Sequence, residues 1–152
     1  MTKKDWAHTF FDVARVMSER SDDPHTKCGC VLANKTNEII ATGYNGSIRG
    51  SQHGQIPLTR PEKYDYMVHS EHNAVLNCAR QGRSTIDAVA YITGAPCNWC
   101  IQYMWQAGIK EMYYTDFNKP KMMDNDEHRK VRAHLLDILG PLGLKMSFIK
   151  EK

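Results

Sequence analysis

The feature that most constrains the fold is a regular alternation of helical and β patterns along the second half of the chain. Apolar residues recur every three or four positions over one segment, and a short apolar run bounded by turn residues follows. Strands that are separated by a helix need a crossover connection, so they lie parallel in one sheet whose faces the helices cover. We expect helices at residues 69–81, 96–107 and 126–139 and strands at residues 88–93, 111–115 and 144–149.

The first half of the chain predicts one helix, a β-hairpin and a long loop. The apolar spacing over residues 5–18 gives a helix one apolar face, and two short apolar runs at 28–33 and 38–42 flank a four-residue turn. From Gly43 onward the chain is expected to be irregular, and a loop as long as 47–62 in a small domain is usually functional. The predicted fold is α/β, a three-layer α/β/α sandwich around a central mixed five-stranded sheet.

Composition narrows the class of protein. The 152 residues are 41% hydrophobic and 24% charged, which is typical of one globular domain. No apolar run approaches the roughly 18 residues that a membrane span needs, and the N-terminus lacks the apolar stretch of a secretion signal, so we expect a cytoplasmic protein with no membrane partner. A net charge of +3 suits a small anionic ligand and makes nucleic acid an unlikely partner. Five cysteines without a secretion signal indicate metal binding or catalysis rather than disulfides.

Two short motifs at predicted helix starts carry metal-ligand chemistry. Residues 69–71 read His-Ser-Glu and residues 96–100 read Pro-Cys-Asn-Trp-Cys, and H-x-E followed by P-C-x-x-C is the signature of zinc deaminases. Cys97 and Cys100 lie on one helix face in the first turn, where the helix dipole favours thiolates. His69 supplies a third ligand, which leaves the fourth position of a tetrahedral zinc open for water. Glu71 is then the base that such a water needs.

Two other interpretations of the C-x-x-C motif stay open on the sequence alone. The pair is also typical of a dithiol redox site at a helix start. A closed structural zinc site is the other possibility, with Cys28, Cys30 or Cys78 as fourth ligand or as part of a second metal site. These three cysteines fall in predicted strand and helix segments, where we expect them to be core residues. A closed site would also leave Glu71 without a role.

Four blocks between Arg20 and Tyr114 resemble the deoxycytidylate (dCMP) deaminases of the cytidine deaminase superfamily. The zinc motifs alone indicate the superfamily, whereas the first two blocks are typical of its nucleotide branch. Ser70 stands where the family has alanine. The blocks are Arg20-Ser21-Asp22-Asp23-Pro24, similar to R-S-x-D-P; Gly43-Tyr44-Asn45-Gly46, similar to G-Y-N-G; Lys63-Tyr64 leading to His69-Ser70-Glu71-His72-Asn73-Ala74, similar to K-Y and H-A-E-x-N-A; and Pro96 to Cys100 with Gln106-Ala107-Gly108-Ile109, similar to P-C-x-x-C and Q-A-G-I.

The resemblance implies a cytidine deaminase-like fold and a single zinc-dependent deaminase domain over residues 1–152. It implies hydrolysis of dCMP to dUMP and ammonia, with dUMP supplying thymidylate synthesis. His69, Cys97 and Cys100 would bind one Zn²⁺, and Glu71 would move the protons. Four other residues would bind the substrate. Asn45 would hydrogen-bond the sugar, Arg20 and Ser21 would hold the phosphate, and Ser70 would contact the substrate beside the metal.

The resemblance also implies regulation and assembly. Arg80, Tyr44 and Gly46 would belong to an allosteric site for dCTP or dTTP with Mg²⁺, in a homohexamer. Two alternatives to dCMP deamination stay open. One is the same chemistry on a modified cytosine nucleotide, a free nucleoside or a tRNA base, and the other is a non-enzymatic structural zinc module.

Overall fold

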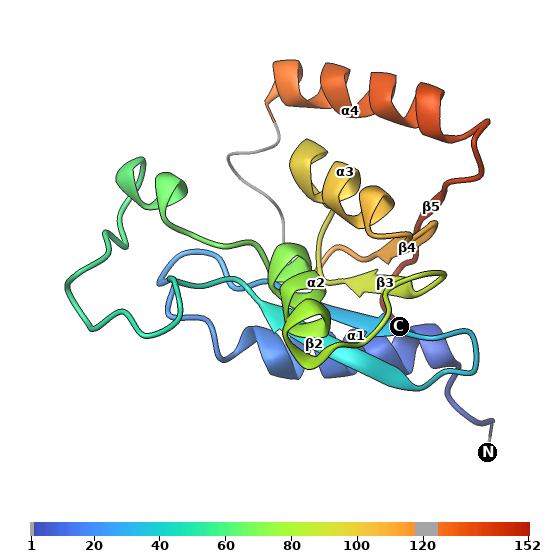
Figure 1. Cartoon of the computed structure of the whole chain (residues 1–152), viewed down its shortest axis with the longest axis horizontal. Coiled ribbons are helices and arrows are strands. Elements are labelled where there is room, and N and C mark those ends of the chain that lie inside the picture. Colours follow the sequence, from blue (N-terminus) through green and yellow to red (C-terminus); the bar gives the residue numbers. More distant parts are fainter. Residues whose placement is uncertain (1, 118–124) are drawn as a thin grey trace.

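The patterned segments form four α-helices and one sheet within residues 2–117 and 125–152, which the computed structural model describes (Figure 1). The elements in chain order are α1 (Trp6–Ser18), β1 (Gly29–Ala33), β2 (Ile39–Tyr44), the 3₁₀ turn η1 (Glu62–Asp65), α2 (Ser70–Gln81), β3 (Val89–Ile92), α3 (Asn98–Gln106), β4 (Glu111–Tyr114), α4 (Asp126–Leu139) and β5 (Lys145–Phe148). Each helix and strand expected from the sequence is present, with ends that differ by a few residues.

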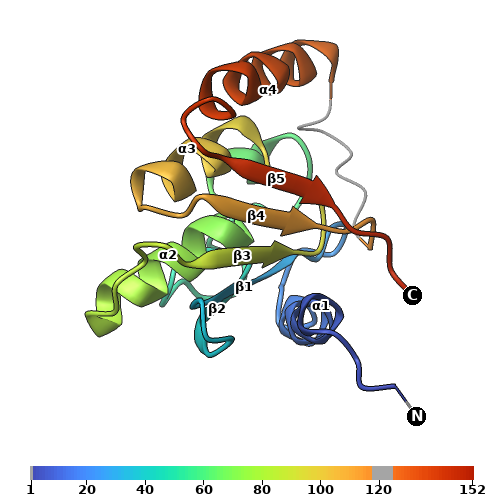
Figure 2. The same ribbon diagram turned by 90° about the vertical axis from the view of Figure 1, so that its right-hand side faces the viewer.

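The sheet is mixed, as predicted, and its strand order is β2-β1-β3-β4-β5. β1 pairs antiparallel with both β2 and β3, whereas β3, β4 and β5 run parallel. The parallel half follows from the crossovers through α3 and α4, and Figure 2 shows these strands side by side. β5 pairs with β4 at the edge of the sheet, so the C-terminal segment belongs to the same sheet as the other four strands.

The two faces of the sheet bury two separate apolar clusters. In β1, Cys30 and Leu32 belong to the cluster under α2 and α3, and Val31 and Ala33 belong to the cluster under α1. This alternation is the period of two that a strand imposes on its side chains. The helices therefore cover both faces, and the three-layer α/β/α arrangement is confirmed (Figure 1).

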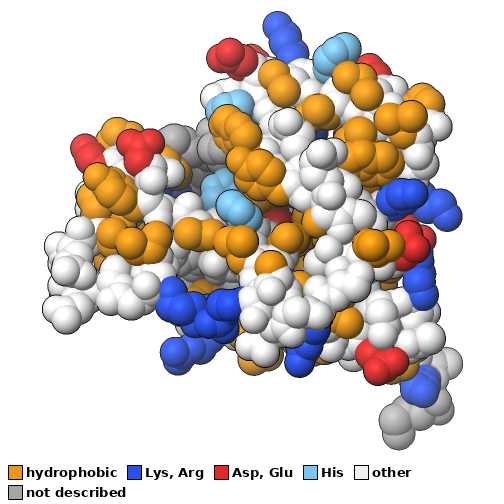
Figure 3. All heavy atoms as spheres, in the orientation of Figure 1, with side chains coloured by type: hydrophobic (Ala, Val, Ile, Leu, Met, Phe, Trp, Pro, Cys, Tyr) orange, Lys and Arg blue, Asp and Glu red, His pale blue; other side chains and the backbone are white. Residues whose placement is uncertain are grey.

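The described part of the chain has no helix that could cross a membrane, and the face drawn in Figure 3 shows no single basic stripe. None of the described helices is long and apolar enough to span a bilayer. On the face drawn in Figure 3, lysine and arginine side chains form several separate groups.

Two boundaries differ from the prediction for physical reasons. β2 continues through Gly43 and Tyr44, which pair with β1, although glycine here was expected to end the strand. Gly43 is needed inside the strand because α2 passes very close to it: a Cβ at this position would lie 2.2 Å from the carbonyl oxygen of Ser70. At the other motif, α3 begins at Asn98 with Cys97 as its N-cap, so Pro96 lies before the helix rather than opening it.

We expect Gly43→Ala to destabilise the protein by about 1–3 kcal/mol, because the added methyl overpacks the contact between β2 and α2. Thermal or denaturant unfolding measures the loss. Gly46→Ala is the matched control, since its Cβ would meet the nearest atom, Asp22 Oδ1, at an ordinary 3.4 Å. Equal stability of the two variants would contradict the close approach of α2.

Candidate metal centre and active-site cavity

Three donor atoms gather where α2 and α3 begin. Nδ1 of His69 lies 3.4 Å from Sγ of Cys97 and 3.4 Å from Sγ of Cys100, and all three donor atoms lie within 4.8 Å of one another. A tetrahedral zinc with ordinary Zn–N and Zn–S bonds needs a nitrogen–sulfur separation of about 3.6 Å. The donor set therefore fits one zinc ion, as the spacing of the two motifs predicted.

The local structure explains why these side chains converge. His69 and Cys97 are both N-cap residues in extended conformation, each directly before the first residue of its helix. Cys100 lies one turn into α3, and its backbone N–H donates to Cys97 Sγ at 3.5 Å. Hydrogen bonds from the Cys100 thiol and from His69 lower the pKa of the Cys97 thiol to about 4, whereas the bond to Cys97 and burial raise the pKa of the Cys100 thiol. Helix N-termini stabilise negative charge, so Cys97 is favoured as a thiolate, and a bound metal would also deprotonate Cys100.

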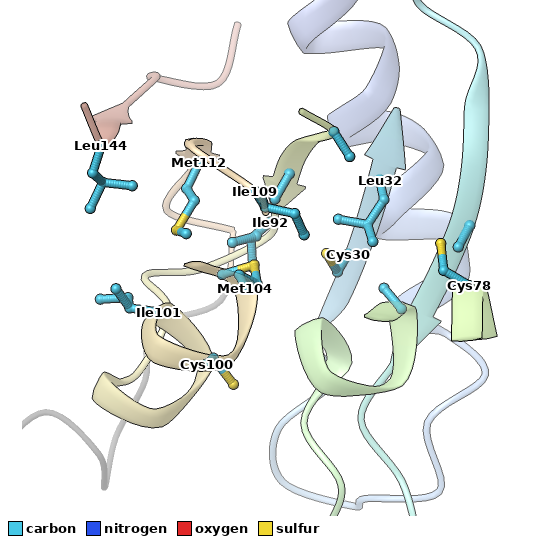
Figure 4. Packing of buried hydrophobic residues seen from close by; sticks show 14 of the residues in the cluster. Cys30, Leu32, Cys78, Ile92, Cys100, Ile101, Met104, Ile109, Met112 and Leu144 are labelled. Carbon is cyan, nitrogen blue, oxygen red and sulfur yellow. The ribbon is translucent and has the colours of Figure 1, made fainter. Parts of the chain in front are cut away.

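The remaining cysteines give no support to a closed site. Cys30 and Cys78 are buried in the apolar cluster, where Figure 4 shows them among packed hydrophobic side chains. Cys28 lines the same cavity as His69 and Cys97 but is not part of the group of donor atoms that lie within 4.8 Å of one another. Among the residues that the structure describes, the only group suited to a metal is the one formed by His69, Cys97 and Cys100. Three ligands leave a tetrahedral ion one open position.

Glu71 lies beside this group in the first turn of α2. Its side chain is only 6% exposed, and its Oε2 accepts a hydrogen bond from the Ser70 hydroxyl at 2.9 Å. Burial raises the pKa of the carboxyl. Glu71, His69 and Cys97 all line one cavity of about 120 Å³. A proton-accepting group and a metal site thus share one cavity, which is the arrangement that hydrolytic chemistry needs.

The structure brings some of the other predicted residues to this cavity and leaves others outside it. Asn45 and Ser70 line the cavity with Glu71. Arg20 is exposed beyond the end of α1, and Ser21 is buried in the following loop, where its Oγ accepts the Asp23 N–H; neither lines the cavity.

The three residues predicted for an allosteric site are divided between two places. Tyr44 and Gly46 flank Asn45, and Gly46 forms a β-bridge with Val68, next to His69. Arg80 is exposed in the last turn of α2 and does not line the cavity.

The amide of Asn45 is held in place by the loop before β1. Its Oδ1 accepts the backbone N–H of Cys28 at 2.8 Å, and its Nδ2 donates to the carbonyl of Thr26 at 2.8 Å. An amide side chain has a second N–H and a second lone pair, so Asn45 keeps hydrogen-bonding capacity for a ligand. The two hydrogen bonds to the backbone fix the orientation of the amide, and so the direction in which its remaining N–H and lone pair point.

Sequence reasoning missed a buried ion pair in the cavity wall. The Lys63 ammonium lies 2.8 and 2.6 Å from the two carboxylate oxygens of Asp23, and both side chains are almost fully buried. Asp23 Oδ1 also accepts the backbone N–H groups of His25 and Thr26. Burial alone would raise the pKa of the Asp23 carboxyl, but these hydrogen bonds hold it below its usual value. The resembling blocks contain both residues, but no pattern in one sequence joins positions this far apart.

The fold and the site together define a class, the zinc-dependent deaminases, in which H-x-E and P-C-x-x-C supply three ligands and a separate glutamate. Comparison with known proteins supports the same class. Residues 4–116 match the family described as the cytidine and deoxycytidylate deaminase zinc-binding region, and the chain belongs to this family.

Named relatives and solved structures extend the match over most of the chain. It is 34% identical over 142 residues to a deoxycytidylate deaminase of Pongo abelii, covering 90% of this chain and 76% of the relative. It is 33% identical over 134 residues to the deoxycytidylate deaminase of Homo sapiens, and the match covers 84% of this chain and 72% of the relative. A crystal structure of the cyanophage S-TIM5 dCMP deaminase in complex with dCMP and dUMP aligns with a TM-score of 0.76 at 23% identity, covering 98% of this chain and all of that one, and so confirms the fold.

We expect the purified protein to contain one zinc ion per chain, and we expect Cys97→Ala and Cys100→Ala to lose it. Because the ligands join two helix starts, both variants should also melt at a lower temperature. Metal analysis of the purified variants provides the test, with Cys30→Ala as a control that removes a core thiol and keeps the zinc. Full zinc occupancy in both ligand variants would refute the assignment.

We expect Lys63→Met to cost about 3–5 kcal/mol of stability, because it leaves the buried Asp23 carboxylate without a counter-ion. Adding Asp23→Asn removes that charge, keeps an acceptor for the two backbone N–H groups, and should restore part of the loss. In the wild type the lowered pKa means that the pair stabilises the fold above the ordinary carboxyl pKa and loses its effect as pH falls through the lowered value. Denaturant unfolding as a function of pH measures both effects, and a cost below about 1 kcal/mol for Lys63→Met would show that the pair is dispensable.

Proposed function

We propose that the protein is a zinc-dependent deaminase that hydrolyses dCMP to dUMP and ammonia. The observation that carries the proposal is the cavity lined by His69 and Cys97 of the His69, Cys97 and Cys100 donor group together with the buried Glu71. The family match and the relatives named as deoxycytidylate deaminases support dCMP as the substrate.

The chemistry divides between the donor set and Glu71. A zinc ion held by His69, Cys97 and Cys100 would supply a Lewis acid that makes water nucleophilic at neutral pH. Glu71 takes a proton from the water as its oxygen adds to C4 of the cytosine ring, and passes that proton to N3. Glu71 then takes the second proton from the new C4 hydroxyl and passes it to the exocyclic amine, the C4–N bond breaks, and ammonia leaves as the C4 carbonyl forms. The hydrogen bond from Ser70 keeps the carboxylate directed while it alternates between these acceptors.

The remaining binding roles follow from the resemblance and are part of the same proposal. Asn45 bonds the sugar, and its two backbone contacts support this role because they preorganise the amide. Ser70 contacts the substrate beside Glu71. Arg20 and Ser21 are candidates for the phosphate on the strength of the motif alone, because both lie outside the residues that line the cavity.

The wider role is proposed on the same basis. The dUMP product would supply thymidylate synthesis, in a cytoplasmic enzyme that forms a homohexamer. The chain acts as one domain over residues 1–152, which the pairing of β5 with β4 supports. Effector binding of dCTP or dTTP with Mg²⁺ at Tyr44, Gly46 and Arg80 would reach the site through Gly46, whose bridge to Val68 adjoins His69.

A substrate panel tests the proposal directly. Ammonia release is measured with dCMP, 5-methyl-dCMP, CMP, dCTP and deoxycytidine, and dCMP is expected to give the highest kcat/KM. A preference for 5-methyl-dCMP or for deoxycytidine would favour the alternative substrates. No release from any of them, with zinc fully bound, would favour a structural zinc module.

We expect Glu71→Gln to lower the turnover number by about 10²–10⁴, because it removes the proton acceptor and keeps the side chain's size. Zinc content and melting temperature should match those of the wild type, since Glu71 is not a ligand. Glu38→Gln, at an exposed glutamate beside the β-hairpin turn, is the matched control and should keep full activity. Near-normal turnover of Glu71→Gln would mean that another group moves the proton.

A further inference from the structure

The cavity has an asymmetric distribution of positive charge. Of the described residues that line it, Arg60 and Lys63 are permanently cationic. The Lys63 ammonium is buried and bonded to both oxygens of Asp23, so its charge is neutralised within the wall. Arg60 is exposed, and no described carboxylate lies within ion-pair distance of it. Arg60 is therefore the cavity residue that offers an uncompensated positive charge to a ligand.

Arg60 is held in a defined place along the wall. Its Nη2 donates to the hydroxyl of Thr26 at 3.1 Å, and the carbonyl of Thr26 accepts the amide of Asn45. The residue before Asn45, Tyr44, is bonded through its carbonyl to Asn73 of α2 at 2.8 Å. A connected wall thus runs from the start of α2 through Asn45 and Thr26 to Arg60. The guanidinium has five N–H donors, so most of them stay available beyond the bond to Thr26.

Tyr64 adds an unsatisfied polar group to the same wall. Its hydroxyl oxygen is buried in the cavity lining and has no hydrogen-bond partner among the described residues. Burial raises the pKa of this hydroxyl, although the neighbouring Arg60 charge opposes the shift, so it remains an O–H donor at neutral pH. Lys63 lies 5.5 Å over the ring and helps to fix its position. A buried hydroxyl without a partner is costly unless a ligand satisfies it.

We propose that Arg60 and the Tyr64 hydroxyl, rather than the motif residues Arg20 and Ser21 outside the cavity lining, form the subsite for the 5′-phosphate of the nucleotide, and that they set the preference for a nucleotide over a nucleoside. The inference rests on the proposed function, which places the base at the donor group and Glu71. The phosphate, one sugar away from the base, then lies further along the wall, beyond Asn45. A guanidinium and a phenol O–H match phosphate oxygens, which accept charge-assisted hydrogen bonds.

The test compares dCMP with deoxycytidine, which lacks the phosphate. Losing a hydrogen bond to a charged group costs a factor of about ten to one hundred in affinity. The ratio of kcat/KM for dCMP over that for deoxycytidine should therefore fall about ten- to a hundredfold in Arg60→Gln, and about tenfold in Tyr64→Phe, while kcat/KM for deoxycytidine stays constant. Tyr64→Phe should fold at least as well as the wild type, because it removes an unsatisfied group.

A matched control and a binding measurement complete the design. Arg49→Gln removes an exposed arginine from the same loop, where Arg49 bonds Asn77 and not the cavity, and its ratio should stay at the wild-type value. Calorimetry of dCMP binding in the zinc-loaded Glu71→Gln background should show the same loss of affinity on adding Arg60→Gln. An unchanged ratio in Arg60→Gln or in Tyr64→Phe overturns the role of that residue. A wild type that is inactive on both substrates instead refutes the proposed function.

Discussion

The convergence of two helix N-termini is the interaction on which the site depends. α2 and α3 cover the same face of the sheet, and their first residues meet so that one imidazole and two sulfurs can share a metal ion. Both helices direct the positive ends of their dipoles at this point, which favours negative charge there, and a bound cation would neutralise the two thiolates that hold it. The metal would in turn tie the two helix starts together, so the function and the stability of this region rest on the same bonds.

A second set of polar contacts builds the other wall of the cavity. The buried Asp23–Lys63 pair joins the loop before β1 to η1, and Thr26 extends this network to Asn45 and Arg60. A buried ion pair adds little net stability over an apolar contact, but its directional bonds fix the loops that carry it. We infer that this pair serves to keep the long loop across the cavity, where its side chains can meet a substrate.

The sequence predicted the fold and the metal centre well, and the cavity wall poorly. Hydrophobic periodicity located the four α-helices and five strands that the structure describes but not the short 3₁₀ turn η1, because burial on one face imposes a period that local sequence records. The H-x-E and P-C-x-x-C motifs located His69, Glu71, Cys97 and Cys100, because each motif lies within one helical turn. Contacts between distant segments leave no such record, as with Asp23 and Lys63, forty positions apart. The continuation of β2 through Gly43 was also missed, since only the approach of α2 explains that glycine.

X-ray absorption at the zinc edge tests most directly the central claim, that the metal centre is open toward the cavity that holds Glu71. The account predicts two sulfur neighbours at about 2.3 Å and two nitrogen or oxygen neighbours at about 2.0–2.2 Å, one of them from solvent. It also predicts that binding of dCMP or a product analogue changes the nitrogen and oxygen neighbours of the zinc and leaves its two sulfur neighbours unchanged. Three or four sulfur neighbours, unaffected by the nucleotide, would describe a closed structural zinc site and contradict the account.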